Sequence, residues 1–242
     1  MSVDVAAADH DANLLLAALS DTDRQRLVPH LRALDLPGGE VLQRAGDIVV
    51  DTWFPCGAAL ASFTIDSGAG QGVEVAIIGR DGAIGGIVSN GSLPAYATAT
   101  VRGAGRFLCI RTVALEQAKL ESIHLRHWFA RYADCLLAQV FQTAACNATH
   151  TIAQRASRWL LSAAERTGRA DLAMTQEDLA GMLGVGRSFM TRVFGELRRA
   201  GVVETGRGRI RIADRAALRR TACDCSTLVE NHFHQVLGGI YD

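Results

Sequence analysis

The sequence predicts an α+β protein in which an antiparallel sheet comes first, a long helix follows and a compact helical domain ends the chain. Between residues 40 and 110, short alternating or apolar runs are separated by turn-forming residues, a pattern typical of an antiparallel sandwich or roll. From about residue 124, apolar residues recur at helical spacing instead. With 242 residues, the chain can bury a sizeable core in one large domain or two modest ones.

Composition predicts a globular protein of the cytoplasm. Hydrophobic residues make up 49% of the chain, yet no apolar run reaches the roughly 18 residues that indicate a membrane span. The first residues are acidic where an export signal would be basic. Without an export signal, a disulfide framework is not expected, and we predict reduced, buried thiols. The six cysteines are Cys56, Cys109, Cys135, Cys146, Cys223 and Cys225.

The first elements are predicted from caps and turn residues. An amphipathic stretch over residues 13–34 predicts helix, with a cap at Ser20 and Asp21 and a stop at Pro37-Gly38-Gly39. Five runs that follow predict strands, because each is short, apolar or alternating, and bounded by turn residues. These runs cover residues 48–50, 58–65, 73–78, 97–101 and 106–110.

The long helix carries a track of residues spaced alternately by four and three. The track contains Leu125, Phe129, Tyr132, Leu136, Gln139, Thr143 and Cys146. Such spacing is expected where a helix lies against a partner helix, although a helix packed on its own sheet also fits. Because the helix has more than one apolar stripe, we favour a homodimer. The residues predicted for its seam are Leu125, Phe129, Tyr132, Leu136 and Val140.

Charge is distributed unevenly, although the net charge is zero. Residues 1–150 hold 11 Lys or Arg against 15 Asp or Glu, a balance of −4, whereas residues 151–242 hold 14 against 10, a balance of +4. From residue 187 to 220 there are ten arginines against three acidic residues. This surplus predicts a polyanionic partner for the C-terminal region, with a merely solvated basic face as the alternative.

Residues 175–203 predict two short helices joined by a tight turn. Thr175 and Asp178 have the spacing of a capping box, and Gly184 suits a left-handed turn. Apolar residues define the inward face of each helix, which leaves a polar set at the start of the second helix facing outward. That set is Arg187, Ser188, Thr191 and Arg192.

Such a pair of helices suits double-stranded DNA. The first helix, which starts with Thr175 and Gln176, can cross the phosphate backbone while the second enters the major groove. Arginine fits there because its planar fork can bond guanine O6 and N7 together. Residues 202–212 then alternate around Gly206-Arg207-Gly208, which predicts a hairpin whose Arg207 and Arg209 contact phosphates. A structural helical hairpin, or one that contacts protein, is the alternative.

Three segments together resemble the Crp/Fnr family of bacterial transcription regulators. They are LPGGEVLQRAGD at residues 36–47, GRDGAIGG at residues 79–86, and MTQEDLAGMLGVGRSFMTRVFGELRRAGVVETGRGRIRI at residues 174–212. The resemblance implies a cyclic-nucleotide-binding-like β-roll, a dimerisation helix and a winged helix-turn-helix that binds a two-fold-related operator. It also implies RNA polymerase as a partner if the protein is an activator. The corresponding domains are residues 1–122, 123–148 and 149–221, followed by a tail of residues 222–242.

The β-roll departs from the members that bind cyclic nucleotides. Those members use a Gly-Glu-Leu turn for the ribose and an Arg-Ser/Thr-Ala stretch for the phosphate. The matching segments here, residues 84–87 and 97–99, contain no glutamate and no arginine. Without that arginine a cyclic phosphate loses its bidentate partner, so we expect no cyclic nucleotide. The nearby arginines that could replace it as a phosphate ligand are Arg80, Arg102 and Arg106.

Other site chemistries have weaker support. A cupin-like enzyme needs histidine ligands on its strands, but no histidine lies between His30 and His124. An N-terminal iron–sulfur cluster is not expected, because it needs several early cysteines and none precedes Cys56. In the tail, Cys223 and Cys225 precede two histidines, His232 and His234, at a spacing unusual for zinc. We therefore predict no enzyme and no cofactor; the alternative is a ligand- or metal-binding sensor whose winged helix contacts protein.

Overall fold

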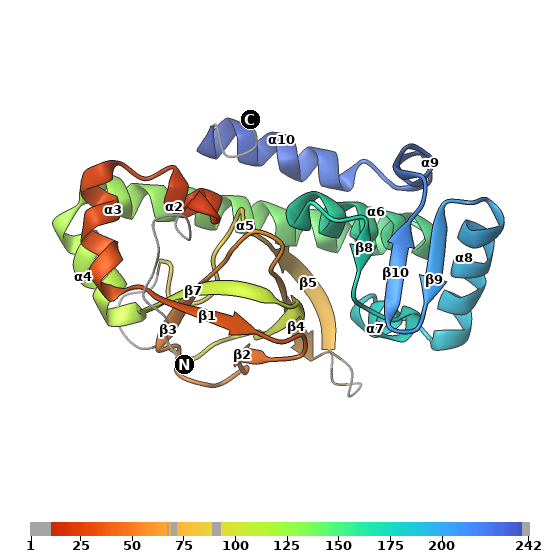
Figure 1. Ribbon diagram of the computed structural model, residues 1–242, viewed down its shortest axis with the longest axis horizontal. Helices are drawn as coiled ribbons and strands as arrows, with labels where there is room; N and C mark the ends of the chain where they lie inside the picture. The colour runs from red at the N-terminus through yellow and green to blue at the C-terminus, as the bar shows by residue number, and fades with distance from the viewer. Residues whose placement is uncertain (1–10, 67, 69–71, 89–92, 239–242) are drawn as a thin grey trace.

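The computed structural model describes residues 11–66, 68, 72–88 and 93–238. Residues 1–10, on which the expectation of no export signal rests, lie outside the described residues. The fold is α+β, as predicted (Figure 1). A β-roll lies beneath a long helix, a smaller α/β unit lies at one end, and the last helix runs back over the top. Within the described part, no helix has the length and apolar character needed to cross a membrane.

The chain begins with short helices and then a strand. Helix α2 (Leu14–Ala17) and helix α3 (Asp21–Leu27) are followed by the 3-10 turn η1 (Val28–His30) and strand β1 (Arg32–Leu36). The predicted cap at Ser20 is confirmed, since its hydroxyl accepts from the Asp23 N–H at 3.2 Å. The prediction of helix as far as residue 34 is wrong. Pro29 lies in η1, and the residues after it pair with a strand of the roll.

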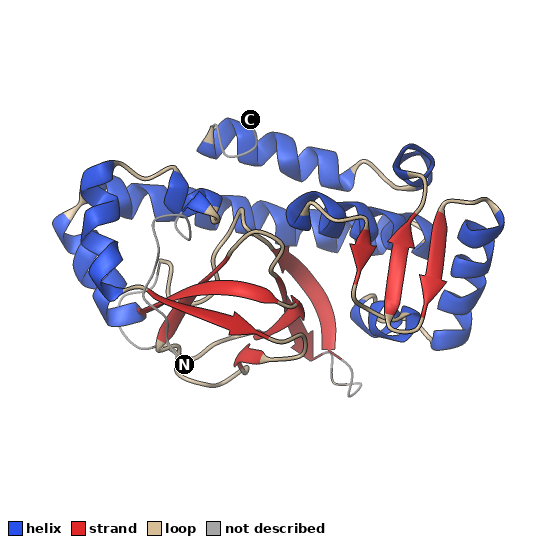
Figure 2. Ribbon diagram, in the orientation of Figure 1, coloured by secondary structure: helices blue, strands red, loops and turns tan. Residues whose placement is uncertain are grey.

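Two antiparallel sheets form the roll, as the turn spacing predicts (Figure 2). One has the order β1-β7-β3 and the other the order β2-β6-β4-β5. Residues 48–50, predicted as a strand, form only an isolated bridge at Ile48 to Pro94. The strands after β1 are β2 (Val41–Gln43), β3 (Asp51–Pro55), β4 (Leu60–Asp66), β5 (Gly72–Ile78), β6 (Thr98–Gly103) and β7 (Gly105–Arg111).

Helices α4 (Thr112–Glu121) and α5 (Ile123–Thr149) follow the roll, and α5 lies along it. Ser122 caps α5 by accepting from the Leu125 N–H at 3.2 Å. The Tyr132 hydroxyl donates to the Ala83 carbonyl at 3.0 Å and accepts from the Ala83 N–H at 2.9 Å. Gln139 donates to the Ile77 carbonyl at 3.1 Å. These bonds fix α5 on the roll of its own chain.

The C-terminal unit begins with α6 (Ile152–Thr167), which ends at Gly168 in the left-handed conformation that glycine adopts readily. A three-stranded sheet of order β8-β10-β9 packs with the helices that follow. Its remaining elements are β8 (Asp171–Leu172), α7 (Gln176–Met182), α8 (Arg187–Arg199), β9 (Val203–Gly206), β10 (Arg209–Ile212) and α9 (Arg215–Thr221). The tail forms α10 (Cys225–Leu237), which runs along α5 and contributes Val229, Phe233 and Leu237 to the core beside Phe129.

The C-terminal unit packs firmly on the roll. Leu60 and Ile77 of the roll share a core with Trp159 of α6. The Trp159 indole N–H donates to the buried Glu74 carboxylate at 2.5 Å. Arg166 of α6 pairs with Asp81 of the roll at 3.1 Å, and both side chains are almost fully buried. Apolar contacts and buried polar bonds together fix the position of α6 against the sheet.

Candidate nucleic-acid interface

Helices α7 and α8 meet at the predicted turn. The Thr175 hydroxyl accepts from the Asp178 N–H at 3.0 Å, and the Asp178 carboxylate accepts from the Thr175 N–H at 2.7 Å. This reciprocal pair is the capping box that the sequence predicts. Gly184 follows α7 with a φ of 66°, a left-handed conformation that costs glycine little. The chain therefore reverses between the two helices without strain.

The inward faces of the two helices form one core with α6 and the small sheet. Leu179 and Met182 of α7 are buried against Met190, Val193 and Phe194 of α8. The isoleucines of β10 close the same core. Because one stripe of α8 is committed to this core, its other residues must face outward.

The predicted base-contacting residues lie on that outward face. Arg187, Ser188, Thr191 and Arg192 are all exposed. Arg187 lies 3.4 Å from Glu177 of α7, but both side chains are more than 60% exposed. An ion pair of this kind contributes little in water, so Arg187 can exchange Glu177 for another partner at small cost.

The hairpin after α8 has the alternation that the sequence predicts. In β10, Ile210 and Ile212 are buried in the core while Arg209 and Arg211 are exposed to solvent. Arg207 lies in the turn, next to Gly208 with a φ of 69°. Arg198 of α8 donates to the Thr205 hydroxyl at 3.2 Å and so joins the hairpin to the helix. The hairpin is a wing that carries arginines beside the exposed face of α8.

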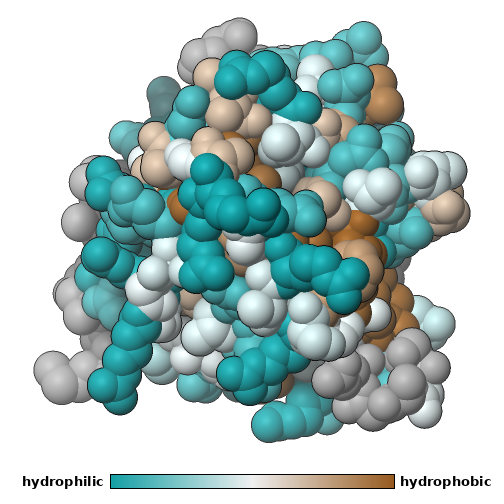
Figure 3. Space-filling model, turned by 90° about the vertical axis from the view of Figure 1, so that its right-hand side faces the viewer, coloured by the Kyte–Doolittle hydropathy of each residue, from teal (hydrophilic) through white to brown (hydrophobic). Residues whose placement is uncertain are grey.

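A hollow of about 320 Å³ lies between the start of α7, the start of α8 and the wing. Five of the eight predicted DNA-binding residues line it, namely Thr175, Gln176, Arg187, Thr191 and Arg209. Ser188, Arg192 and Arg207 are exposed outside its lining. The view onto this end of the molecule is mostly hydrophilic (Figure 3). The fold thus brings together residues that are 34 positions apart in sequence, Thr175 and Arg209.

Sequence reasoning missed Phe189 on this face. Its side chain is 44% exposed on α8, and the Arg192 guanidinium lies 5.5 Å from its ring centroid. An exposed aromatic ring on such a helix can contact the methyl group of thymine and can hold an arginine in place. The sequence contained a signal for this position. Met190, Val193 and Leu197 already form the inward stripe of α8, so Phe189, one residue before Met190, is expected to face outward.

Three of the five residues predicted for the dimer seam are fully covered by the chain itself, which corrects the prediction for Leu125, Phe129 and Tyr132. Leu125, Phe129 and Tyr132 are at most 1% exposed, inside the core formed with the roll and α10. Leu136 and Val140 are partly buried against the roll. The four-three spacing of this track therefore reflects packing within one protomer, the alternative that the sequence left open.

Helix α5 has a second track with the same spacing, and this one is exposed. Leu137 and Phe141 are 48% and 64% exposed, an unusual state for large apolar side chains one helical turn apart. Small exposed alanines continue the track on both sides. Its apolar members are Ala130, Leu137, Phe141, Ala144 and Ala148, and we call them the outer track.

Two glycines in the segment that corresponds to the ribose-binding turn are tightly packed. Gly85 has a φ of 89°, and a Cβ atom there would lie 2.5 Å from the Asp51 carbonyl oxygen. A Cβ atom at Gly86 would collide with the Thr112 side chain. The turn can therefore hold no larger residue without moving its neighbours.

Of the three arginines considered as substitutes for the phosphate ligand, two bind other side chains and one is exposed. Arg106 makes a two-point contact with Asp35 at 2.8 and 3.1 Å. Arg102 donates to the Ser62 hydroxyl at 2.8 Å, and Arg80 is exposed to solvent. Inside the roll, apolar side chains pack together, among them Ile84, Val101 and Phe107.

Comparison with known families decides the nature of the C-terminal unit. A model of the Crp-like helix-turn-helix domain matches residues 154–221, which run from α6 through α9. The chain carries a Crp-like helix-turn-helix domain. A search of curated protein sequences found no relative of the chain.

Solved structures extend the likeness from the Crp-like domain to the whole fold. FixK2 from Bradyrhizobium japonicum is 15% identical, with a TM-score of 0.66 over 80% of this chain and 98% of that one. A transcriptional regulator of the CRP family from Thermus thermophilus is 19% identical, with a TM-score of 0.63 over 78% and 95%. The c-di-GMP-responsive regulator CLP from Xanthomonas campestris is 13% identical, with a TM-score of 0.65 over 81% and 100%. The roll, α5 and the Crp-like domain thus form a Crp/Fnr fold.

Proposed function

We propose that this protein is a sequence-specific, DNA-binding transcription regulator that acts as a homodimer. The observation that carries the proposal is the exposed start of α8, where Arg187, Ser188, Thr191 and Arg192 lie beside an arginine-bearing wing. A Crp-like domain in residues 154–221 supports the same function.

The parts of this surface have different tasks. Helix α8 enters the major groove, where Arg187 and Arg192 contact base edges and Phe189 adds apolar contact. Thr175 and Gln176, at the start of α7, lie near the phosphate backbone. The wing arginines, Arg207 and Arg209, contact phosphates beside the groove, which adds affinity without sequence preference.

A second copy of this chain is the partner of the outer track. Leu137 and Phe141 are exposed at coiled-coil spacing, and the neighbouring alanines permit close approach of an identical helix. A two-fold axis along α5 then presents two α8 helices to one face of a duplex. Their half-sites are expected to be about one helical turn apart.

The proposed regulator does not use a cyclic nucleotide as its signal. Residues 84–87 and 97–99 lack the glutamate and arginine used by members that bind one, and Gly86 has no room for a side chain. Where DNA binding activates transcription, RNA polymerase is the expected protein partner.

Selection from a pool of random duplexes tests the proposal while the operator is still unidentified. Purified wild-type protein is expected to enrich a two-fold-related sequence with half-sites about one turn apart. Arg111→Ala, which changes an exposed arginine of the roll, serves as the matched control and is expected to enrich the same sequence. A wild-type pool that stays random after repeated rounds would contradict sequence-specific binding.

Sedimentation separates the dimer from the DNA-contacting surface. Phe141→Glu places a charge in the outer track and is expected to yield monomers, because two carboxylates would face each other across the axis. Leu228→Glu changes a similarly exposed leucine on α10 and is expected to leave the dimer intact. Monomeric wild-type protein at micromolar concentration would overturn the proposed seam.

A further inference from the structure

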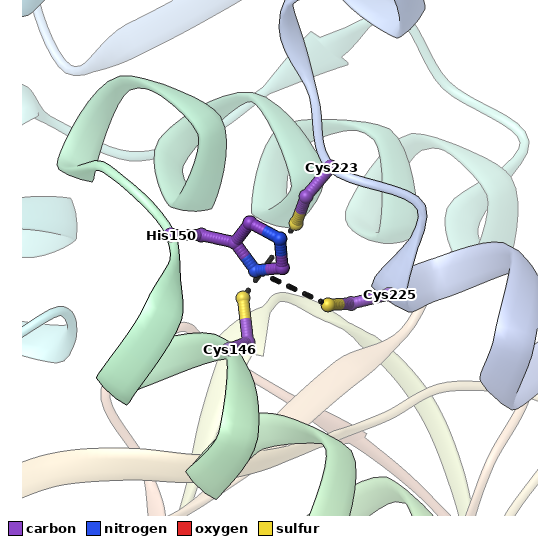
Figure 4. A group of neighbouring side chains, drawn as sticks. All are labelled: Cys146, His150, Cys223 and Cys225. Carbon is purple, nitrogen blue, oxygen red and sulfur yellow. Dashed lines mark hydrogen bonds between the residues drawn. The ribbon is translucent and has the colours of Figure 1, made fainter.

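Four potential metal ligands meet where α5 ends and α6 begins. Cys146 lies in the last turn of α5 and His150 directly after that helix. Cys223 lies in the link between α9 and α10, and Cys225 is the first residue of α10. Figure 4 shows the three sulfur atoms and the imidazole ring pointing toward one another. The ligand atoms of the four residues all lie within 4.8 Å of one another.

These distances suit one tetrahedral ion. Zinc–sulfur bonds of about 2.3 Å in a tetrahedron place the ligand sulfurs about 3.8 Å apart. Here the Cys146 and Cys223 sulfurs are 3.6 Å apart, and the Cys225 sulfur lies 3.5 Å from His150 Nδ1. The longest separation in the group exceeds the ideal by only about 1 Å, which small side-chain rotations can close. Three cysteines and one histidine are also a common ligand set of structural zinc sites.

A hydrogen-bond donor and two buried arginines belong to the surroundings of the group. Gln142 donates from its side-chain amide to the Cys225 sulfur at 3.2 Å. Arg155 and Arg158 of α6 are at least 91% buried, and the Nε atom of each has no hydrogen-bond partner. Three thiolates around a divalent ion carry one net negative charge, which such buried cations would balance.

Two simpler interpretations account for less of this arrangement. Packing of buried thiols explains the apolar contacts of Cys146, Cys223 and Cys225, but not the imidazole directed at them. A disulfide between Cys146 and Cys223 would leave Cys225 and His150 without a role. The two tail histidines that the sequence places after Cys225 are not part of the group.

We propose that Cys146, His150, Cys223 and Cys225 bind a single zinc ion. The ion fastens the C-terminal helix α10 to the junction between α5 and α6, through which the roll connects to the Crp-like domain. Because its ligands come from the end of α5 and from the tail, binding closes a loop of about 75 residues that contains the whole of that domain. The site is structural: it has four protein ligands and leaves no open position for a substrate.

Metal analysis of the full-length protein tests the proposal directly. Reduced wild-type protein, loaded with zinc and dialysed, is expected to retain one ion per chain. Cys223→Ser and Cys225→Ser are expected to lose it. Cys135→Ala is the matched control, because Cys135 is fully buried on the same helix α5 but lies outside the group. It is expected to retain zinc as the wild type does.

Two further measurements on the wild type keep the test informative if a variant does not fold. Cobalt in place of zinc is expected to give sulfur-to-metal charge-transfer bands and the d–d spectrum of a tetrahedral site. Zinc, but not magnesium, is expected to raise the melting temperature, and a chelator is expected to reverse that rise. Reduced protein that retains no zinc, a cobalt spectrum without sulfur ligation, or equal retention by Cys223→Ser would each overturn the proposal.

Discussion

Charged side chains differ in burial between two regions of the molecule, the outer face of the Crp-like domain and its contact with the roll. On the Crp-like domain, arginines of α8 and the wing are exposed to solvent, and Arg187 has only a weak, exposed ion pair. Where that domain meets the roll, charges are buried instead: Asp81 pairs with Arg166, and Glu74 accepts from Trp159. An exposed charged side chain can exchange its partner for another at little cost in free energy, whereas separating a buried pair is strongly destabilising. The exposed set therefore suits recognition and the buried set fixes domain orientation.

The largest expected effect comes from the buried pair. Asp81→Ala leaves the Arg166 guanidinium buried without this carboxylate, and the free energy of unfolding should fall by about 3–5 kcal/mol. Asp35→Ala removes the carboxylate from an ion pair whose acid is 70% exposed, so the melting temperature should barely change. Urea denaturation of the two variants checks the contrast. Equal losses would show that burial does not distinguish the pairs.

The pH dependence of the unfolding free energy should reveal the protonation of Glu74. Burial raises the pKa of Glu74 to about 7 from its ordinary value of 4.5, although the Trp159 hydrogen bond and nearby arginines oppose the rise. Between these values the folded state holds a proton that the unfolded state has lost, so stability falls as pH rises, by at most about 3 kcal/mol.

Glu74→Gln removes this titration and should flatten the pH profile of the unfolding free energy between pH 4.5 and 7. Part of the slope should persist, because burial and the neighbouring Glu165 raise the pKa of Glu230 to about 7 as well. An unchanged slope in Glu74→Gln would show that Glu74 stays ionised in the folded state.

On the exposed surface, the arginines of α8 should affect specific binding most. Arg187→Ala and Arg192→Ala are each expected to weaken binding to the selected duplex by about 1–3 kcal/mol, with a smaller loss on scrambled DNA. Fluorescence anisotropy with both duplexes measures the difference. If the two duplexes lose affinity equally, the residue contacts phosphate and not base edges. Stability should not change, since both side chains are exposed.

Wing arginines should give the smallest and least selective effect. Arg207→Ala or Arg209→Ala is expected to weaken binding to all duplexes alike and to reduce the slope of log K against log salt by about 1. Titrations over a range of potassium chloride concentrations measure that slope. A slope identical to that of the wild type would place these arginines away from the phosphates.

The Crp-like domain was predictable from sequence because local signals specify it. The Thr175–Asp178 box, the Gly184 turn and the alternation around Arg207 each depend on residues a few positions apart, and each is present.

The packing of helix α5 was harder to predict, because the helix carries two tracks with the same period. Which track is buried depends on the roll and α10, and periodicity contains no information about partners.

The cysteine and histidine group also depends on contacts between distant segments, which local sequence patterns do not reveal. Cys146 and Cys223 are 77 positions apart, and only the path of α10 back along α5 brings them together. A partial signal existed, because Cys146 and His150 have the spacing of one helical turn and Cys225 lies two residues after Cys223. Neither pair alone indicates a site. The strand at Arg32–Leu36 was missed for a local reason, since Pro29 breaks the first helical stretch and the prediction continued the helix through it.

The central claim is that the exposed start of α8 distinguishes one DNA sequence from another. The most direct test compares wild-type binding to the selected duplex and to its scrambled form over a series of salt concentrations. We predict that both affinities fall steeply with salt because counterions are released, and that the selected duplex stays at least about 1000-fold tighter. Equal affinity for the two duplexes at every salt concentration would contradict the account.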